Sequence, residues 1–309
     1  MLELECFRLR LHQCHVLTGT RYAPFAYDAW TNPETLAILS KIAGVELVPE
    51  MNYEIGHINF SVKSDRETQE ERAEIENQKR FFAEDEGIAG CPWEDDKPVV
   101  GWHKDSYPFV CVLMLSDCTD MVGGETALRT AEGSVIKVRG PEMVSSTQRY
   151  RRCPIVVNVI KGCAVVLQGR YITHQALRAL GTKERITSVT SFRPKSAHLA
   201  DDSVLTTVRP ISDLSELYYD YGEYRLEILE ERIRAKLHEL KTKRRAGKSF
   251  ETIEFKNFLE KQTAFMKHTD NEIIEEDKVP IGHIDEINIP DVKVGEDKPP
   301  KLVEESPVS

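Results

Sequence analysis

The tetrapeptide Trp102-His103-Lys104-Asp105 has the residue types and spacing of a metal site. In an extended segment, side chains two residues apart project from the same face, so the His103 imidazole and the Asp105 carboxylate would point the same way. Together they supply two of the three ligands of the two-His-one-carboxylate triad that holds non-haem Fe(II). Because a His-x-Asp pair is common by chance, the interpretation needs a third ligand brought close by the fold.

His174 is the candidate for that third ligand. It ends the polar segment 169–174, which directly follows the apolar run 163–168. A histidine at the end of a buried strand suits a site at the mouth of a barrel. Without His103, a surface or capping histidine would be the better interpretation.

Arg185 lies eleven residues after His174 and begins the β-branched run Arg185-Ile186-Thr187. An arginine that enters a core strand is costly unless it meets an anion, and its planar guanidinium suits a carboxylate. The partner is either a structural Asp or Glu or a small dicarboxylate. Arg193 would share the same face of this strand and is the alternative anchor.

Residues near the metal segment provide candidate pocket positions. In the predicted strand 51–62, alternation places three polar side chains on one face, namely Tyr53, His57 and Asn59. This face either lines a pocket or meets solvent, and the pattern favours neither. Trp102 and Tyr107 flank the metal segment, where aromatic residues more often pack in the wall than select a substrate.

These residues in this order resemble the Fe(II)/2-oxoglutarate-dependent dioxygenases. The likeness lies in a His-x-Asp pair, a histidine 71 residues on, and an arginine eleven further with a hydroxyl two residues later. The double-glycine turn 123–126 (GGET) looks like that of prolyl-hydroxylase-type members, and segment 56–59 (GHIN) is similar to fungal biosynthetic members. The resemblance covers roughly residues 45–195.

The resemblance implies a role for each matching position. The implied Fe(II) ligands are His103, Asp105 and His174. Arg185 would hold the distal carboxylate of the cosubstrate 2-oxoglutarate, with Thr187 as a hydroxyl donor, and O2 would take the remaining position on the iron. The implied reaction decarboxylates 2-oxoglutarate to succinate and CO2 and abstracts hydrogen from a substrate.

Two alternatives within this superfamily are less favoured. Halogenases of the superfamily lack the carboxylate ligand to make room for chloride, whereas Asp105 is present here. The spacing of eleven residues from His174, against nineteen, favours Arg185 over Arg193 as the cosubstrate anchor.

Short strands must position these residues. The strands are expected at 51–62, 108–115, 133–138, 154–160, 163–168 and 185–192. Helices are expected at 33–43, between Asn32 and Gly44, and over the charged stretch 65–86. This order, without alternating β and α segments, predicts a mainly β protein with flanking helices (α+β). The resemblance implies a double-stranded β-helix (jelly-roll, cupin-like) core.

The chain divides by composition into an N-terminal strand and helix segment (1–44), the core (45–195), a C-terminal helical segment (196–269) and a tail (270–309). The tail holds twelve acids and four lysines and is expected to be disordered. Within the helical segment, apolar residues follow helical spacing at Leu226, Leu229, Ile233, Leu237 and Leu240. We expect this stripe to pack against the main domain or to form a homodimer through the C-terminal helices.

Composition narrows the function classes. The 309 residues carry 41 basic and 51 acidic side chains, a net charge of −10, which argues against a nucleic-acid binder. The sequence contains no apolar run near the ~20 residues of a membrane span, and its first residues do not resemble a signal peptide. A cytoplasmic protein is expected. Seven cysteines without a Cys-x-x-Cys pair give little support for zinc or disulfides.

The prediction is an oxygenase acting on a small-molecule substrate by C–H hydroxylation, desaturation or oxidative cyclisation. The alternatives are a protein side-chain (prolyl-type) hydroxylase and a non-catalytic cupin-like interaction module. The full set of ligands counts against the module, which would have no need of them. The lack of a peptide-recognition segment favours the small-molecule reading over the protein hydroxylase.

Overall fold

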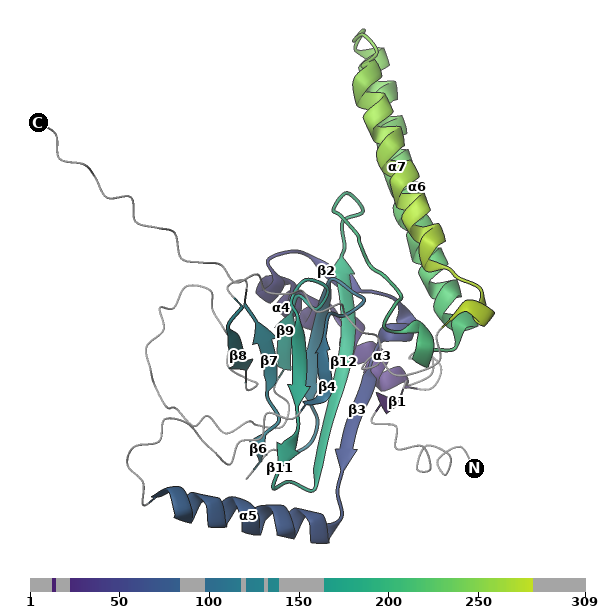
Figure 1. Ribbon diagram of the computed structural model, residues 1–309. Coiled ribbons are helices and arrows are strands. Elements are labelled where there is room, and N and C mark those ends of the chain that lie inside the picture. The colour runs from purple at the N-terminus through teal and green to yellow at the C-terminus, as the bar shows by residue number, and fades with distance from the viewer. Residues whose placement is uncertain are drawn as a thin grey trace, which may run out of the picture.

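The protein forms antiparallel β-sheets flanked by helices, which confirms the predicted α+β class (Figure 1). It is not mainly β, because more of the described residues lie in helices than in strands. The computed structural model describes residues 13–14, 23–83, 98–117, 121–130, 133–138 and 164–279. The predicted strand 154–160, most of the segment before residue 23 and the acidic residues 280–309 lie outside these ranges. The described strands form separate sheets and not a closed barrel.

The larger sheet is built around β12 (Glu184–Pro194), its longest strand. Its order is β1-β3-β12-β5-β9, with β2 also paired to β12 and every pairing antiparallel. The other strands are β1 (Gln13–Cys14), β2 (Leu47–Pro49), β3 (His57–Val62), β5 (Phe109–Met114) and β9 (Ala164–Leu167). The strands predicted at 108–115, 163–168 and 185–192 are thereby confirmed.

A second sheet has the order β4-β10-β7-β8. Its strands are β4 (Pro98–His103), β7 (Thr126–Arg129), β8 (Val135–Val138) and β10 (His174–Leu177). A two-stranded sheet pairs β6 (Val122–Gly123) with β11 (Ala179–Leu180). The antiparallel register of β4 and β10 places His103 directly opposite His174.

The predicted strand 51–62 is wrong in its first half. Residues Asn52–Glu54 form a 3-10 helix, η1, and the strand begins only at His57, after Gly56 with φ 78°. The 3-10 turn removes Tyr53 from the alternation of β3. Its backbone N–H donates to Asp220 at 2.8 Å, and its hydroxyl accepts from a backbone N–H of the C-terminal segment. Tyr53 therefore packs toward the C-terminal helices.

Helices form where the sequence predicts them. A short helix, α3 (Pro24–Thr31), precedes α4 (Pro33–Ala43). Asn32 caps α4 by accepting from the Glu34 N–H, and Gly44 ends it with φ 74°. Helix α5 spans Asp65–Ala83. Trp30 and Leu39 pack with Phe109 and Phe192 of the larger sheet in one core cluster.

Two long helices, α6 (Leu214–Arg245) and α7 (Thr252–Glu272), form a hairpin that projects away from the sheets (Figure 1). Within the described ranges, none of the helices combines the length and apolar composition that a membrane span needs. Between the sheets and α6 lies a short 3-10 helix, η2 (Arg209–Ile211).

The expectation of a disordered tail from residue 270 is wrong for its first part. Helix α7 continues to Glu272 and a 3-10 turn, η3, spans Glu276–Lys278. The Glu272 carboxylate accepts from the Leu205 N–H at 2.7 Å and pairs with Arg209 at 2.6 Å. Acidic composition alone predicted disorder, but this carboxylate has a cation and a backbone donor that hold it in place.

Packing against the main domain, one of the two arrangements expected for the apolar stripe of α6, is found for only one of its residues. The helix buries another face, with Leu217, Tyr221, Tyr224 and Ile228 in a core cluster. Helical periodicity identifies apolar faces but does not tell which of two faces the rest of the chain covers. Of the stripe, only Leu229 packs against that cluster.

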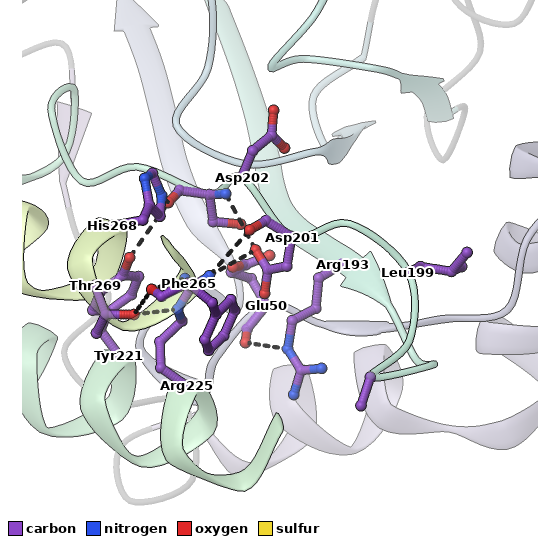
Figure 2. Close-up of polar contacts among 12 residues, drawn as sticks. Glu50, Arg193, Leu199, Asp201, Asp202, Tyr221, Arg225, Phe265, His268 and Thr269 are labelled. Atoms are coloured by element: carbon purple, nitrogen blue, oxygen red, sulfur yellow. Dashed lines mark hydrogen bonds and ion pairs between the residues drawn. The ribbon is translucent and has the colours of Figure 1, made fainter. Parts of the chain in front are cut away.

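A buried polar cluster joins the hairpin to the sheets (Figure 2). Arg225 of α6 pairs with Asp201 at 3.3 Å and donates to Thr269 of α7 at 2.9 Å. Beside it, Arg193 donates to the backbone carbonyl of Glu50 at 3.2 Å. Burial of Glu50, and then the negative charge of Asp201, raise the pKa of the Glu50 carboxyl to about 8.

We expect Glu50 to make the protein less stable as pH rises from about 5 to 8. The folded state keeps the Glu50 proton up to about pH 8, whereas the unfolded chain releases it near the ordinary carboxyl pKa of 4.5. Between these values the unfolded state binds fewer protons, so the free energy of unfolding falls with rising pH. Glu50→Gln should flatten this dependence and be the more stable protein at pH 8, as measured by thermal unfolding at both pH values.

The control is Glu260→Gln, at an exposed position of α7, which should keep the wild-type pH dependence. A Glu50→Gln protein that loses stability between pH 5 and 8 as steeply as the wild type would contradict the expectation.

Candidate metal centre

The three predicted metal ligands converge. His103 ends β4, Asp105 follows two residues later, and His174 begins β10. The Asp105 carboxylate lies 3.5 Å from Nε2 of His103 and 3.4 Å from Nε2 of His174. One ligand atom from each residue lies within 4.8 Å of the others, and the described residues contain no further group of this kind.

Backbone carbonyls orient both imidazoles. Nδ1 of His103 lies 2.7 Å from the Gly101 carbonyl oxygen, and Nδ1 of His174 lies 2.9 Å from that of Ile172. A carbonyl can only accept, so each Nδ1 carries the proton and each Nε2 keeps its lone pair. This bond to the other ring nitrogen is the arrangement that fixes metal-binding histidines.

Gly169 gives Asp105 its place. The Asp105 N–H donates to the Gly169 carbonyl at 2.9 Å, and a Cβ built on Gly169 would collide with the Asp105 carboxylate. Any larger residue at position 169 would therefore displace the ligand. Sequence reasoning missed this role, and the only available signal was a glycine at the end of an apolar run.

Asp105 is an anionic ligand at neutral pH. Burial acts to raise the pKa of its carboxyl, but the interactions with the two neighbouring histidines, His174 and then His103, outweigh burial and leave the pKa below its usual value. A carboxylate and two neutral imidazoles on one side of a cavity suit Fe(II), with positions left open for other ligands.

The triad lines a cavity of about 140 Å³ whose walls come from both main sheets. Other predicted site residues also line it, namely His57, Asn59, Tyr107, Arg185 and Thr187. The placement of His57 and Asn59 in the cavity wall agrees with the interpretation that the polar face of β3 lines a pocket. Their side chains lie 3.2 Å apart, between His57 Nε2 and Asn59 Oδ1.

Arg185 and Arg193 lie in different surroundings. Arg185 lines the cavity, and its Nη2 donates to the Gly124 carbonyl at 3.4 Å. Arg193 is not among the cavity-lining residues, and its guanidinium lies 4.7 Å from the centre of the Tyr224 ring. Of the two arginines, only Arg185 is placed to meet a ligand in the cavity.

The double-glycine turn lies beside Arg185. Gly123 and Gly124 have φ of 78° and 77°, which favours glycine. A Cβ on Gly123 would come 2.6 Å from the Arg178 carbonyl oxygen, so the close approach of the two backbones also requires glycine. The turn thereby presents the carbonyl that Arg185 contacts.

Two predicted pocket residues lie outside the cavity lining, Tyr53 and Trp102. Trp102 alternates with His103 along β4, and its ring lies 4.8 Å from the Arg129 guanidinium carbon. Tyr53 lies in the buried cluster below the C-terminal helices. The position of Trp102 agrees with the interpretation that this aromatic residue packs in the wall. Tyr53 lies outside the cavity because the segment expected to be a strand forms a 3-10 turn.

Glu54 is a cavity residue that sequence reasoning missed. It is 4% exposed, and its carboxylate accepts from the Tyr107 hydroxyl at 3.0 Å. Burial raises the pKa of the Glu54 carboxyl to about 7 against the lowering effect of the Tyr107 bond. A strand over 51–62 would have pointed Glu54 away from Tyr53 and His57, so alternation gave no signal for it.

The C-terminal segment also contributes to the cavity. Thr207, Val208 and Ile211 line it together with Ser106, whose hydroxyl lies 2.5 Å from that of Thr207. This segment carries no motif, and its place follows only from the way the chain returns to the sheets before α6.

Comparison with known proteins gives a limited likeness. No protein-family model and no curated protein matches the sequence. An oxidoreductase of the 2OG-Fe(II) oxygenase family from Burkholderia pseudomallei is 12% identical, with a TM-score of 0.32, over 55% of each chain. A prolyl-4-hydroxylase from Pseudomonas putida is 18% identical, with a TM-score of 0.22, over 56% of this chain and 98% of its own.

The chain thus spans about half the length of the first of these structures. At such TM-scores the superpositions are loose, so the chemistry proposed for this chain is taken from its own side chains.

Proposed function

We propose that this protein is a non-haem Fe(II) and 2-oxoglutarate-dependent oxygenase that acts on a small molecule. The observation that carries the proposal is the convergence of His103, Asp105 and His174, with Arg185 in the same cavity. The triad would bind the metal, and the half-buried Arg185 would bind a carboxylate in the same cavity.

The side chains divide the work as follows. His103 and His174 offer Nε2 lone pairs, and Asp105 offers a negative charge that offsets part of the metal charge. Fe(II) held there would supply, with O2 and 2-oxoglutarate, the oxidising chemistry for removing hydrogen from a substrate.

Arg185 and Thr187 orient the cosubstrate. The Arg185 guanidinium would pair with the distal carboxylate of 2-oxoglutarate, and the hydroxyl of the buried Thr187 would donate to the same group. Such a clamp directs the keto acid end toward the triad. The two antiparallel sheets that meet around the cavity are the arrangement we assign to a double-stranded β-helix.

A small-molecule substrate is supported by the size of the cavity, about 140 Å³, and by the polar side chains set among its mostly apolar walls, which include Glu54, Asn59, Ser106 and Thr207. The double-glycine turn, which favoured a protein substrate, contacts Arg185 and so serves the cosubstrate whatever the substrate is. Hydroxylation, desaturation and cyclisation all begin with the same hydrogen abstraction from the substrate.

We expect the purified protein to convert 2-oxoglutarate to succinate when Fe(II) and O2 are present, and to do so faster with its substrate. The measurement is succinate formation across a panel of metabolites and a panel of proline-containing peptides. His174→Ala is the inactive control, since it removes one ligand. Stimulation by peptides alone would support the protein hydroxylase, and absence of both iron binding and turnover would leave only the non-catalytic module.

A further inference from the structure

Helix α6 buries cations on one side and exposes large apolar residues on the other. The side that meets α7 buries two cations, with Arg225 1% exposed and Lys236 9% exposed. The Arg225 guanidinium carbon lies 3.6 Å from the centre of the Phe265 ring, and Lys236 pairs with Glu254 at 2.5 Å. The side away from α7 and the core carries large apolar residues that the described chain leaves exposed.

On this side lie Tyr219, Leu226, Ile233 and Leu237, which together with the half-buried Leu240 are called the stripe of α6 from here on; Leu229, which packs against the core, is not part of it. The first four are 69%, 66%, 49% and 49% exposed. Tyr219, Leu226, Ile233 and Leu240 follow each other at intervals of seven residues, and Leu237 lies four residues after Ile233. A seven-residue repeat keeps apolar side chains on one face along the whole helix and is the pattern of a seam between two helices.

The charges beside the stripe indicate what covers it. The first part of α6, 214–230, holds five acids and one arginine, a net charge of −4. The second part, 231–245, holds seven basic residues and two acids, a net charge of +5. Lys236 and Lys243 pair with Glu239, Glu251 and Glu254 within the hairpin, and the exposed cations at the end of the helix are Lys241, Arg244 and Arg245. A partner helix must therefore be basic at one end and acidic at the other, in the opposite direction.

We propose that the stripe of α6 binds the same stripe of a second copy of this chain, with the two helices antiparallel. An antiparallel copy places its basic part against the acidic part of the first helix, and the two-fold axis makes the contact self-complementary. A parallel copy would place like charges together. The apolar seam supplies the attraction, and the charges set the direction.

The shape of the molecule leaves room for this contact. The hairpin projects from the sheets, and the distal part of α6 stands clear of them (Figure 1). A helix of 32 residues is about 48 Å long, so an antiparallel pair places the two sheet regions at opposite ends of the seam. The cavity with the triad lies in the sheets, so this proposal is independent of the proposed function.

The first test is the mass of the full chain in solution. We expect wild-type protein at about 50 µM to run as a dimer of the 35.2 kDa chain in sedimentation equilibrium. Leu226→Glu combined with Ile233→Glu should raise the dissociation constant at least about a hundredfold, because a buried seam does not accept unpaired charges. Circular dichroism should stay unchanged, since both side chains are about half exposed or more in one chain.

The matched control is Leu259→Glu. Leu259 is 48% exposed and lies on α7, the other helix of the same hairpin. This variant should remain a dimer. A monomeric wild type, or a dimer that only Leu259→Glu dissociates, would overturn the proposal.

The second test concerns direction, and uses Glu223, Glu227, Lys241 and Arg245. All four are exposed, and in the part of the chain that the structure describes none of them has an ion pair. Glu223→Lys with Glu227→Lys should weaken the dimer about tenfold or more, and so should Lys241→Glu with Arg245→Glu. The four changes together should restore the wild-type dissociation constant, because the charges are then exchanged.

In a parallel pair the acidic part of one helix lies beside the acidic part of the other, and the two basic parts also lie together. Reversing the charges of one part in both copies still leaves like charges together, so the repulsion is unchanged. Dissociation constants of all three charge variants within about twofold of the wild type would therefore overturn the antiparallel arrangement.

Discussion

Replacing Asp105 with alanine should lower the affinity for Fe(II) at least about a hundredfold and bring 2-oxoglutarate turnover to background. Asp105 is the only anionic ligand of the triad, and its two oxygens lie 3.5 and 3.4 Å from the Nε2 atoms of His103 and His174. Two imidazoles alone offer neither the third donor nor the charge. Anaerobic calorimetry measures the affinity, and the visible charge-transfer band of iron with bound 2-oxoglutarate should disappear.

The control for this experiment is Glu54→Gln, which removes another buried carboxylate from the same cavity. It should keep the affinity for Fe(II) within about threefold, because Glu54 is bonded to Tyr107 and is not among the converging ligands. Equal loss in both variants would mean that the charge of the cavity, and not ligation by Asp105, controls iron binding. Full iron binding by Asp105→Ala would refute the triad.

Arg185→Ala should raise the KM for 2-oxoglutarate at least about tenfold while iron binding survives. A bidentate arginine–carboxylate contact contributes about 1.5–3 kcal/mol, and each 1.4 kcal/mol changes an equilibrium constant tenfold. Arg185→Lys should show much of the same loss, since lysine lacks the planar pair of donors. The measurement is the dependence of succinate formation on 2-oxoglutarate concentration.

Arg193→Ala is the matched variant on the same strand. Arg193 contacts the Glu50 carbonyl and the Tyr224 ring, away from the cavity, so its loss should change the KM by no more than about threefold. Some loss of thermal stability is expected from the same contacts. If Arg193→Ala raises the KM and Arg185→Ala does not, Arg193 is the anchor. If neither does, the cosubstrate is not 2-oxoglutarate.

The sequence predicts best where a role depends on short spacing. His103 and Asp105 are two residues apart, and a strand followed by a short extended segment suffices to bring them together. The apolar runs that became β5, β9 and β12 were equally readable, because buried strands of these lengths are rich in β-branched residues.

Other features depend on contacts that no local pattern contains. Glu54 enters the cavity because three residues form a 3-10 turn, which the alternation of 51–62 conceals. Thr207 reaches the cavity from a segment without a motif. Leu226 and Ile233 show the limit of periodicity, since the apolar face was recognised but the main domain covers the opposite one.

The place of β4 in its sheet has a consequence for the metal. β4 is an edge strand, held on one side by β10 and without a paired strand on the other in the described residues. His103 and His174 face each other across that pairing, so an ion bound to both cross-links an outer strand to its neighbour. Because metal binding and strand pairing are thermodynamically linked, a change that breaks the pairing of β4 with β10 lowers the affinity for iron. Bound iron in turn stabilises that pairing.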